Sequence, residues 1–426
     1  MTGGVEVHLD EDSALRLVGI LRPSYQGAAL ASSSFEYDAS YLTSGYALSP
    51  DLPLKPGRLW SPDSTTLFGA FADASPDEWG QRILHAARER AARASGERLP
   101  RISEFDYLLG VSDATRLGAL RLRPVGSEEW LSSVDGAADI HELHRILAAS
   151  RRYEAHEATD EDIAYLNGVA TSPGGARPKA NVMLDGGRLG LAKLPHSKDG
   201  DIDVERWEAV ALHLAAEAGM RVPPFSIAAG EGRKAVLLLE RFDRGADGAR
   251  RGYMSAASAM QLGTHRTGTD LSYLDLADSL SELVASPRTE LHELFRRIAL
   301  TIFVNNVDDH WRNHGFLRSE RGWLLSPLFD VNPSVQRGLV QSRLISDRSV
   351  PGERDIGELL DAADAFELRR PDAARMLASI AAVVDRWEDV AHGFGIPDAE
   401  IQAMWPAFDP TDRERARAYA AASDGS

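Results

Sequence analysis

Residues 303–316 read FVNNVDDHWRNHGF, and the fold of the chain is predicted outward from this stretch. An apolar run with helical periodicity, residues 298–304, ends here in a cluster of Asn, Asp and His side chains. Two short apolar runs follow, residues 315–317 and 323–325, and a charged turn that contains Gly322 joins them. Two apolar runs joined in this way predict a β-hairpin directly after a buried helix.

Three polar side chains flank this hairpin, Asp308 and Asn313 before it and Asp330 after it. Because a hairpin returns the chain to near its start, we expect the three to lie close together. Mg²⁺ takes carboxylate and amide oxygens as ligands. In protein kinases a catalytic Asp precedes an Asn by five residues, and a second metal-binding Asp follows a short hairpin. The alternative is a polar helix end whose acids face water, but the ordered set favours phosphoryl transfer.

Composition predicts a soluble protein of two or three domains, since 426 residues are too many for one ordinary core. The chain has no cysteine, which excludes disulfides and thiolate metal sites and suits a reducing compartment. Its first twelve residues are polar and acidic, unlike a signal peptide. No apolar run approaches the roughly 20 residues that span a bilayer. We therefore expect a cytoplasmic protein.

The net charge of −17 indicates which kinds of macromolecule the chain would bind. An acidic surface repels the phosphate backbone of nucleic acids, so binding of DNA or RNA by this chain alone is disfavoured. A basic protein partner would be attracted.

A second polar stretch, residues 171–180, reads TSPGGARPKA. Its pair of glycines lets backbone N–H groups approach an anion, and Arg177 and Lys179 add positive charge. The stretch lacks the spacing of a P-loop. It is a candidate phosphate-binding loop, and the alternative is an ordinary Gly/Pro turn.

Lys193 ends the second strand of a predicted hairpin that follows this loop, over residues 182–194. A helix is predicted next, over residues 203–219, with Glu208 in its first half. Kinases hold their phosphate-binding Lys by pairing it with a Glu on a helix. Glu205 is a rival partner, and an edge-strand Lys that aids solubility is the alternative.

Residues 235–239, AVLLL, predict a buried strand that leads into the charged run ERFDR at 240–244. In a kinase this place is taken by the segment between the lobes, whose main-chain groups bind adenine. Taken alone, the charged run is a solvated strand end.

Elsewhere the patterns predict a mixed chain. Strands are expected over residues 5–9, 15–21, 35–37 and 117–122, and helices over 76–96, 137–151, 271–284, 288–304 and several stretches from 355 to 422. We predict an α+β protein with a small β/α N-terminal domain over residues 1–130. A strand-rich lobe over 131–250 and a mostly helical lobe over 251–426 follow, as in a two-lobed protein kinase.

The ordered series of motifs resembles the HipA family, toxins of bacterial type II toxin–antitoxin systems that are serine/threonine kinases. The resemblance covers nearly the whole chain and is carried by LSPDLPL at 48–54, FGAF at 68–71, PDEWG at 76–80, LGAL at 117–120, GGARPK at 174–179, AKLP at 192–195, ERFDR at 240–244, and residues 306–316 and 328–333. Each motif alone is weak evidence, whereas their order is specific.

The resemblance implies an atypical kinase fold that uses ATP and Mg²⁺. Asp308 matches the catalytic aspartate, which orients the acceptor hydroxyl and accepts its proton. The metal ligands are matched by Asn313 and Asp330, and the lysine on the ATP phosphates by Lys193, with Glu208 as its partner. The other residues expected to contact ATP are Gly174, Gly175, Ala176, Arg177, Lys179, Glu240, Phe242 and His310.

The resemblance also implies regulation and partners. Ser172 matches the serine in the Gly-rich loop that such kinases autophosphorylate, with Thr171 as the adjacent alternative. Members of the family phosphorylate aminoacyl-tRNA synthetases. A small DNA-binding helix-turn-helix antitoxin, similar to HipB, is the expected partner, and any contact with DNA would be made through it.

Two other functions compete with the kinase. A metal-dependent phosphohydrolase or nuclease would use Asp308, Asp309, His310 and Asp330 around two cations. That hypothesis leaves Lys193, Glu208 and the Gly-rich loop without a role. The third hypothesis is a pseudokinase that binds a partner without turnover.

Overall fold

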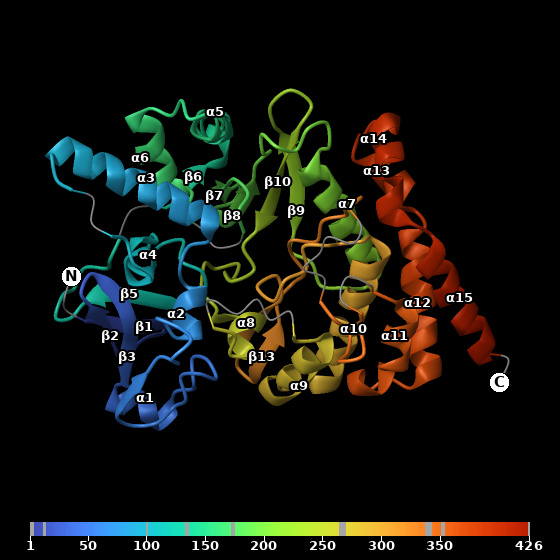
Figure 1. Cartoon of the computed structure of the whole chain (residues 1–426), viewed down its shortest axis with the longest axis horizontal. Helices are drawn as coiled ribbons and strands as arrows, with labels where there is room; N and C mark the ends of the chain where they lie inside the picture. Colours follow the sequence, from blue (N-terminus) through green and yellow to red (C-terminus); the bar gives the residue numbers. More distant parts are fainter. Residues whose placement is uncertain are drawn as a thin grey trace. The chain divides into compact units, whose positions relative to one another are not determined.

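The computed structural model describes residues 4–11, 14–98, 101–132, 136–171, 175–263, 270–336, 343–350 and 354–424, and Figure 1 shows the course of the chain. The chain forms two compact units. Unit 1 comprises the described residues within Met1–Lys198, Gly230–Gly232 and Leu238–Arg266, and unit 2 comprises those within Asp199–Ala229, Arg233–Leu237 and Thr267–Ser426. The division into domains at residues 130 and 250 stays a prediction.

The first part of unit 1 is built on an antiparallel sheet with the strand order β4-β3-β2-β1-β5. Its elements are β1 (Val5–Glu11), β2 (Ala14–Gln26), β3 (Ala29–Tyr37), α1 (Ala39–Ser44), β4 (Arg58–Trp60), α2 (Gly69–Asp73), α4 (Glu104–Gly110) and β5 (Leu120–Pro124). Alternate residues Val5, Val7 and Leu9 of β1 are buried, as the period of two in a half-buried strand requires. They share a core with Phe71 of α2 and Phe105 of α4.

A helical layer follows in the same unit, made of α3 (Glu78–Ser95), α5 (Leu143–Glu154) and α6 (Asp160–Val169). Helix α3 begins and ends where the sequence predicts. The Asp77 side chain caps its first turn by accepting a hydrogen bond from the Gly80 N–H, and Gly96 ends it with a φ of 69° in the left-handed region. Trp79 and Ile83 of α3 pack against α5 and α6.

The predicted helix over 137–151 starts later than expected. Residues Ala138–Asp139 form the short strand β6, a 3₁₀ turn covers Ile140–Glu142 (η1), and α5 begins at Leu143. Asp139 is extended, with a φ of −65° and a ψ of 139°, and its side chain accepts a hydrogen bond from the His141 N–H. The Asp therefore caps a turn at a position where the pattern predicted continuous helix.

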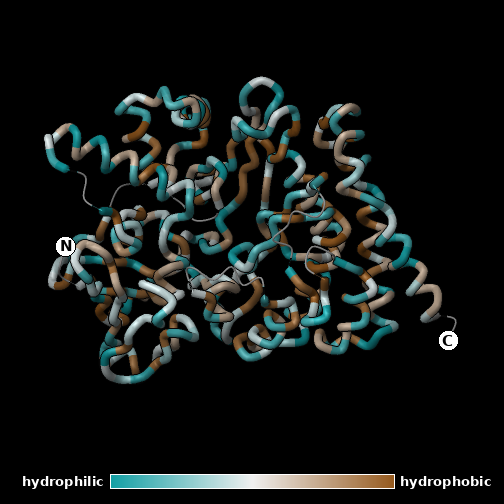
Figure 2. The backbone as a smooth tube through the Cα atoms, in the orientation of Figure 1, coloured by the Kyte–Doolittle hydropathy of each residue, from teal (hydrophilic) through white to brown (hydrophobic). Residues whose placement is uncertain are grey.

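The rest of unit 1 carries the predicted hairpin, β7 (Lys179–Leu184) and β8 (Arg188–Lys193), which pair antiparallel. Strand β6 runs parallel to β7. The short elements β11 (Tyr253–Ser255) and α8 (Ala256–Ala259) complete the unit. Strand β10 (Ala235–Glu240) runs from unit 2 into unit 1, and its hydrophobic residues are coloured brown in Figure 2. Five of its six residues are buried, as the apolar run predicts.

Unit 2 is mostly helical. Besides β9 (Phe225–Ala229) and the hairpin of β12 (Gly315–Ser319) and β13 (Gly322–Leu325), it contains α7 (Val204–Glu217), α9 (Tyr273–Leu283), α10 (Pro287–Phe303), α11 (Ile356–Asp361), η2 (Ala363–Phe366), α12 (Arg370–Val384), α13 (Trp387–Gly393), α14 (Asp398–Met404), η3 (Trp405–Phe408) and α15 (Thr411–Asp424). Helix α10 packs against α9 and α12, and α12 packs against α15.

Helix α7 is held in unit 2 by aromatic packing. Its Trp207 lies against Trp387 of α13 and Phe408 of η3, and the last two rings stack at 4.3 Å. The Trp207 Nε1–H donates to the Glu400 carboxylate at 2.9 Å, so the buried indole has a hydrogen-bond partner. Within the described ranges, no helix is both long and apolar enough to cross a bilayer.

Candidate active site

The segment after α10 is fixed by two asparagines. Asn305 adopts a φ of 47°, in the left-handed region, and this ends the helix. Its side-chain amide donates to the carbonyls of Ser334 at 2.6 Å and Gln336 at 2.9 Å. The Asn306 side-chain oxygen accepts from the Asn332 N–H at 3.3 Å. The start of the FVNNVDDHWRNHGF segment is therefore tied to the chain that follows the hairpin.

The antiparallel β12–β13 hairpin lies between these tied segments, with Phe316 opposite Leu325 and Ser319 opposite Gly322. It brings Asp330 within electrostatic reach of Asp308. Desolvation of its carboxyl raises the pKa of Asp308, His310 and Arg343 act in the opposite direction, and the negative charge of Asp330 raises the pKa further. Asp308 as a whole residue is exposed to solvent.

Asn313 also lies beside Asp308. Its side-chain amide donates to the Asp308 carbonyl at 2.8 Å, and Asn313 is 8% exposed. This hydrogen bond orients the amide group so that its oxygen points away from the Asp308 backbone. The amide oxygen is the atom that an Asn side chain offers to a metal.

Glu208 supports the same site from α7. Its side chain is 2% exposed, and its Oε1 accepts a hydrogen bond from the Asp330 N–H at 3.1 Å. Asp330 has a φ of 54°, in the left-handed region, and the contact with Glu208 helps hold this conformation. The predicted pairing of Glu208 with Lys193 stays a prediction, and the rival Glu205 is also buried.

The structure gives Asp309, the neighbour of Asp308, a different environment. Asp309 is 3% exposed and accepts hydrogen bonds from the Tyr273 hydroxyl and, at 2.9 Å, from the His314 ring. Arg343 donates to the Asp309 carbonyl at 3.0 Å. Burial alone would raise the pKa of Asp309, but the charge and hydrogen bond of His314 and the nearby Arg354 hold it below its ordinary value. Asp309 therefore anchors the loop inward while Asp308 remains at the surface.

Sequence reasoning missed this anchor. The available signal was the Asp308–Asp309 pair itself, because two adjacent acidic side chains need not face the same side of the backbone. One of the two side chains could therefore face the core, provided that a buried hydrogen-bond donor lies there. The donor Tyr273 lies 36 residues away in the sequence, and no local pattern connects the two.

The predicted phosphate loop and Lys193 lie in unit 1. Lys179 and Lys193 stand opposite each other on β7 and β8, so their side chains lie on the same face of the hairpin. Lys179 is 2% exposed, and its ammonium pairs with the Asp77 carboxylate at 2.8 Å. Lys193 is half-buried at the end of β8. Whether both lysines contact a nucleotide stays a prediction, but the charge of Lys179 is already matched by Asp77.

The N-terminal turn of α3 holds the described end of the phosphate loop. The Trp79 indole donates to the Lys179 carbonyl at 3.1 Å, and the Trp79 N–H donates to the Gly175 carbonyl at 3.5 Å. Arg82 donates to the Ala176 carbonyl. Ser172 and Gly174 lie outside the described residues, whereas Thr171 is described and is 1% exposed. The hydroxyl of Thr171 is therefore shielded from a solvent-borne reactant.

The residues predicted to bind adenine lie at the end of β10, also in unit 1. The Glu240 carboxylate pairs with Arg188, and the Phe242 ring lies 6.1 Å from that of Tyr253. Arg241 and Asp243, which alternate with them, are buried. Arg177 of the loop is half-buried, and Gly175 and Ala176 are exposed.

The donor set fits Mg²⁺ better than a transition metal. Among the residues that the structure describes, no group of three His, Cys, Asp or Glu side chains gathers around one point. Two carboxylates and one amide oxygen are a suitable set for Mg²⁺, which keeps several waters and takes few protein ligands. Two polar atoms nearby, His310 Nδ1 and Asn332 Oδ1, are buried and lack a hydrogen-bond partner within the described ranges. Such atoms are consistent with a bound ligand.

Comparison with known proteins identifies two family domains. Residues 6–123 match the model of the HipA N-terminal domain, and residues 171–387 match that of the HipA-like C-terminal domain. A protein of Sinorhizobium fredii with the name "Putative kinase Y4mE" is 25% identical over 195 residues, which are 41% of this chain and 44% of that protein. The chain thus spans less than half the length of that relative.

The fold is similar to that of HipA from Shewanella oneidensis MR-1, solved as a complex of HipA, HipB and operator DNA. The likeness covers 99% of this chain and 98% of the other, with a TM-score of 0.66 and 18% sequence identity. At this identity the likeness concerns the fold. The predicted mixed α and β architecture and the resemblance to HipA are confirmed.

Proposed function

Because the chain belongs to the HipA family, we propose that it is a toxin with serine/threonine protein kinase activity that uses ATP and Mg²⁺. The observation that carries the proposal is the approach of Asp308, Asn313 and Asp330 after a single buried helix and hairpin. This is the order and spacing of the catalytic and metal-binding residues of protein kinases. The site residues remain assignments by resemblance, supported by their geometry within each unit.

Each residue has a distinct proposed role. The nucleotide, when bound with Mg²⁺, supplies the phosphoryl group. Asp308 orients the acceptor hydroxyl and accepts its proton, and the raised pKa of its carboxyl makes it a stronger base than a solvated Asp. Asn313 and Asp330 hold the metal. Lys193 binds phosphate oxygens, with Glu208 as its predicted partner.

The remaining nucleotide contacts are proposed by resemblance alone. Backbone groups of Gly174, Gly175 and Ala176, with Arg177 and Lys179, form the phosphate loop. Main-chain groups at Glu240 and Phe242 bind adenine, and His310 contacts the nucleotide. The Nδ1 of His310 has no hydrogen-bond partner among the residues that the structure describes, and this supports the last assignment.

Target and partner are also proposed. The target is a cytoplasmic protein, with an aminoacyl-tRNA synthetase as the candidate, and its phosphorylation would arrest growth. A HipB-like antitoxin would neutralise the toxin, as the partners in the Shewanella complex suggest. A basic DNA-binding partner would complement the net charge of −17 and make the contacts to DNA that this surface disfavours.

The structure weakens the nuclease hypothesis. A two-cation site would need Asp309 as a metal ligand, but its carboxylate is buried and accepts hydrogen bonds from Tyr273 and His314. Turning it toward a cation would leave both donors buried and unpaired, which costs about 1–3 kcal/mol for each.

Incubation with Mg²⁺-ATP tests the proposed kinase. We expect intact-mass spectrometry to show the gain of one phosphate, which phosphopeptide mapping places at Ser172. A phosphoserine carries about −1.5 to −2 charges and would compete with ATP for Arg177 and Lys193, so the modified protein should lose activity. Ser172→Ala should therefore stay active longer and be more toxic to a host that lacks the antitoxin.

The control for this experiment is Lys193→Ala, compared with Lys198→Ala at an exposed position. The first should gain no phosphate and the second should behave as the wild type. ATP binding without any phosphate gain in the wild type would indicate a pseudokinase. Modification at Thr171, with Ser172 untouched, would contradict the assignment of Ser172.

Asp330→Asn separates charge from backbone conformation. Asn adopts the left-handed region readily, so the variant should keep the φ of 54° and the stability of the wild type. We expect Mg²⁺ to strengthen ATP binding by the wild type but not by Asp330→Asn, as measured by calorimetry with and without Mg²⁺. Asp330→Ala is the matched variant, because it should in addition lose roughly 1–2 kcal/mol through backbone strain. A full Mg²⁺ effect in Asp330→Asn would contradict the role of Asp330 as a metal ligand.

A further inference from the structure

Unit 1 contains a cavity of about 210 Å³ between the end of β10, the β7–β8 turn and the Ala114–Thr115 turn. It is lined by Thr115, Met183, Arg188, Arg241, Arg244 and Ala246, among others. One water takes about 30 Å³ in the liquid, so the cavity can hold a small molecule. Glu240 also lines it, but the Glu240 carboxylate pairs with Arg188. The arginine side chains of this cavity have no role in the proposed kinase chemistry.

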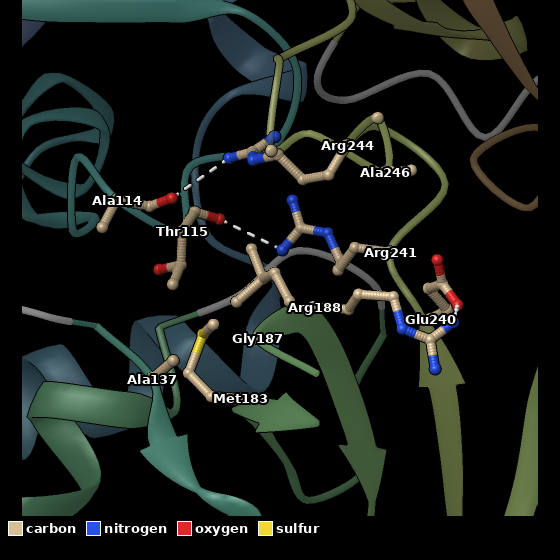
Figure 3. A pocket seen from close by; sticks show the side chains of 13 residues that line it. Ala114, Thr115, Ala137, Met183, Gly187, Arg188, Glu240, Arg241, Arg244 and Ala246 are labelled. Carbon is tan, nitrogen blue, oxygen red and sulfur yellow. Dashed lines mark hydrogen bonds and ion pairs between the residues drawn. The ribbon is translucent and has the colours of Figure 1, made fainter. Parts of the chain in front are cut away.

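Two arginines of the cavity share one carboxylate. The Arg241 guanidinium donates to both Asp243 oxygens at 2.7 Å, and Arg244 donates to Asp243 Oδ2 at 2.7 Å. Asp243 is 0% exposed. Figure 3 shows both arginines reaching toward the same turn, where Arg241 donates to the Thr115 carbonyl and Arg244 to the Ala114 carbonyl, each at 3.1 Å. Arg241, Arg244 and Asp243 together therefore carry one net positive charge.

The excess of positive charge also includes residues that do not line the cavity. Arg116 is 0% exposed and donates to three backbone carbonyls, and Arg121 and Arg250 pair with Asp10 and Asp113. We call this set the arginine cluster: Arg116, Arg121, Arg241, Arg244 and Arg250 with Asp10, Asp113 and Asp243. Five cations face three anions, in a chain whose net charge is −17. Three backbone carbonyls accept from Arg116, and Arg121 is partly exposed to solvent, so part of this excess is offset; the remainder favours a further anion.

Two kinds of observation agree with a missing anion. Burial lowers the pKa of Arg116 to about 10, and burial together with the charges of Arg241 and Arg250 lowers that of Arg244 to about 10 despite Asp243. Three buried polar atoms of this region have no hydrogen-bond partner among the described residues: Thr115 Oγ1, which belongs to a residue of the cavity wall, and Arg116 Nε and Arg250 Nη1, whose residues do not line the cavity. A cationic cluster beside a cavity, with an unsatisfied polar atom in the cavity wall, is suited to bind an anion.

We propose that this cavity binds a small oxyanion of the phosphate class, either inorganic phosphate or a compact phosphate monoester. Arg244 makes its hydrogen bonds to described residues through Nη1 and Nη2, and we assign its Nε–H to the ligand. Guanidinium groups match phosphate oxygens in charge and geometry. Met183 and Ala246 give the cavity wall an apolar part that suits the carbon atoms of a monoester.

Met183 provides the test, because it lines the cavity yet is 36% exposed and belongs to no ion pair. Met183→Glu places a negative charge in the cavity and leaves every arginine of the sequence in place, and Met183→Gln has the same shape without the charge. We expect calorimetric titration with inorganic phosphate, at constant ionic strength, to show binding by the wild type. Met183→Gln should bind within about twofold of the wild type, and Met183→Glu at least about tenfold more weakly because of like-charge repulsion.

Lys193→Ala distinguishes this site from the proposed nucleotide site. We expect the Lys193→Ala variant to bind inorganic phosphate as tightly as the wild type does, whether or not the chain is a kinase. Binding that Lys193→Ala abolishes and Met183→Glu retains would overturn the proposal, as would the absence of binding or equal binding by both Met183 variants. A parallel titration with glycerol 3-phosphate identifies the source of the anion. Tighter binding than that of inorganic phosphate would assign the site to a phosphate monoester.

Discussion

Asp308→Asn should lower the rate of phosphoryl transfer by about 10²–10⁴, the usual contribution of a general base. The amide keeps the shape of the carboxyl but cannot accept the proton of the acceptor hydroxyl. The Asp308 carbonyl, which accepts the hydrogen bond from Asn313, is a backbone group that the substitution leaves in place. ATP binding should therefore change little, and the loss should appear in kcat measured with a peptide or protein acceptor.

Asp364→Asn is the matched control for Asp308→Asn, since it makes the same chemical change at an exposed position of η2. It should keep the activity of the wild type. Full transfer activity in Asp308→Asn would show that another group accepts the proton, and the role proposed for Asp308 would then be wrong.

The parts of this site that local sequence determines were predictable. The apolar run before residue 305, the Gly-containing turn at 322 and the spacing of Asp308, Asn313 and Asp330 each act over a few residues. They predicted α10, the β12–β13 hairpin and the return of Asp330 toward Asp308. Hydrophobic periodicity and turn chemistry are local signals, so one sequence is enough to read them.

The parts that depend on distant partners were not predictable. The ammonium of Lys179 pairs with Asp77, 102 residues earlier, and no local pattern connects the two, whereas the contact of Lys179 with ATP phosphates stays a prediction. The inward anchoring of Asp309 depends in the same way on Tyr273. Strand β9, with the sequence FSIAA, was missed because its alternation is weak and its pairing with β10 is a tertiary contact.

Removal of the buried Asp309 carboxylate should destabilise unit 2 strongly. Asp309→Ala leaves the Tyr273 hydroxyl and the His314 ring without their acceptor, and it removes the negative charge facing His314 and Arg354. Breaking a buried pair by removing one partner costs about 3–5 kcal/mol in the free energy of unfolding. Urea unfolding followed by tryptophan fluorescence measures this loss, and Trp311 lies beside the network, with its ring 5.7 Å from that of Tyr273.

Asp308 and Asp309 should differ in how pH affects their contribution to the free energy of unfolding. The folded-state pKa of Asp309 is lowered, so its ionisation stabilises the fold above the ordinary value of 3.8, and this stabilisation is lost as pH falls through the folded pKa. The folded-state pKa of Asp308 is raised, so its ionised form opposes folding above 3.8. At pH 7, Asp309→Asn should therefore be less stable than the wild type, and Asp308→Asn at least as stable.

The stability gap between the wild type and Asp309→Asn should narrow as the pH falls from 3.8 through the lowered folded-state pKa of Asp309, below which the residue at position 309 is uncharged in both proteins. A gap that stays constant from pH 7 down to acid unfolding would mean that Asp309 contributes through packing and hydrogen bonds alone. Equal stability of Asp309→Ala and the wild type at pH 7 would contradict the anchoring role altogether. Asp308 would then need another explanation for its outward position, since the loop that presents it would not depend on its buried neighbour.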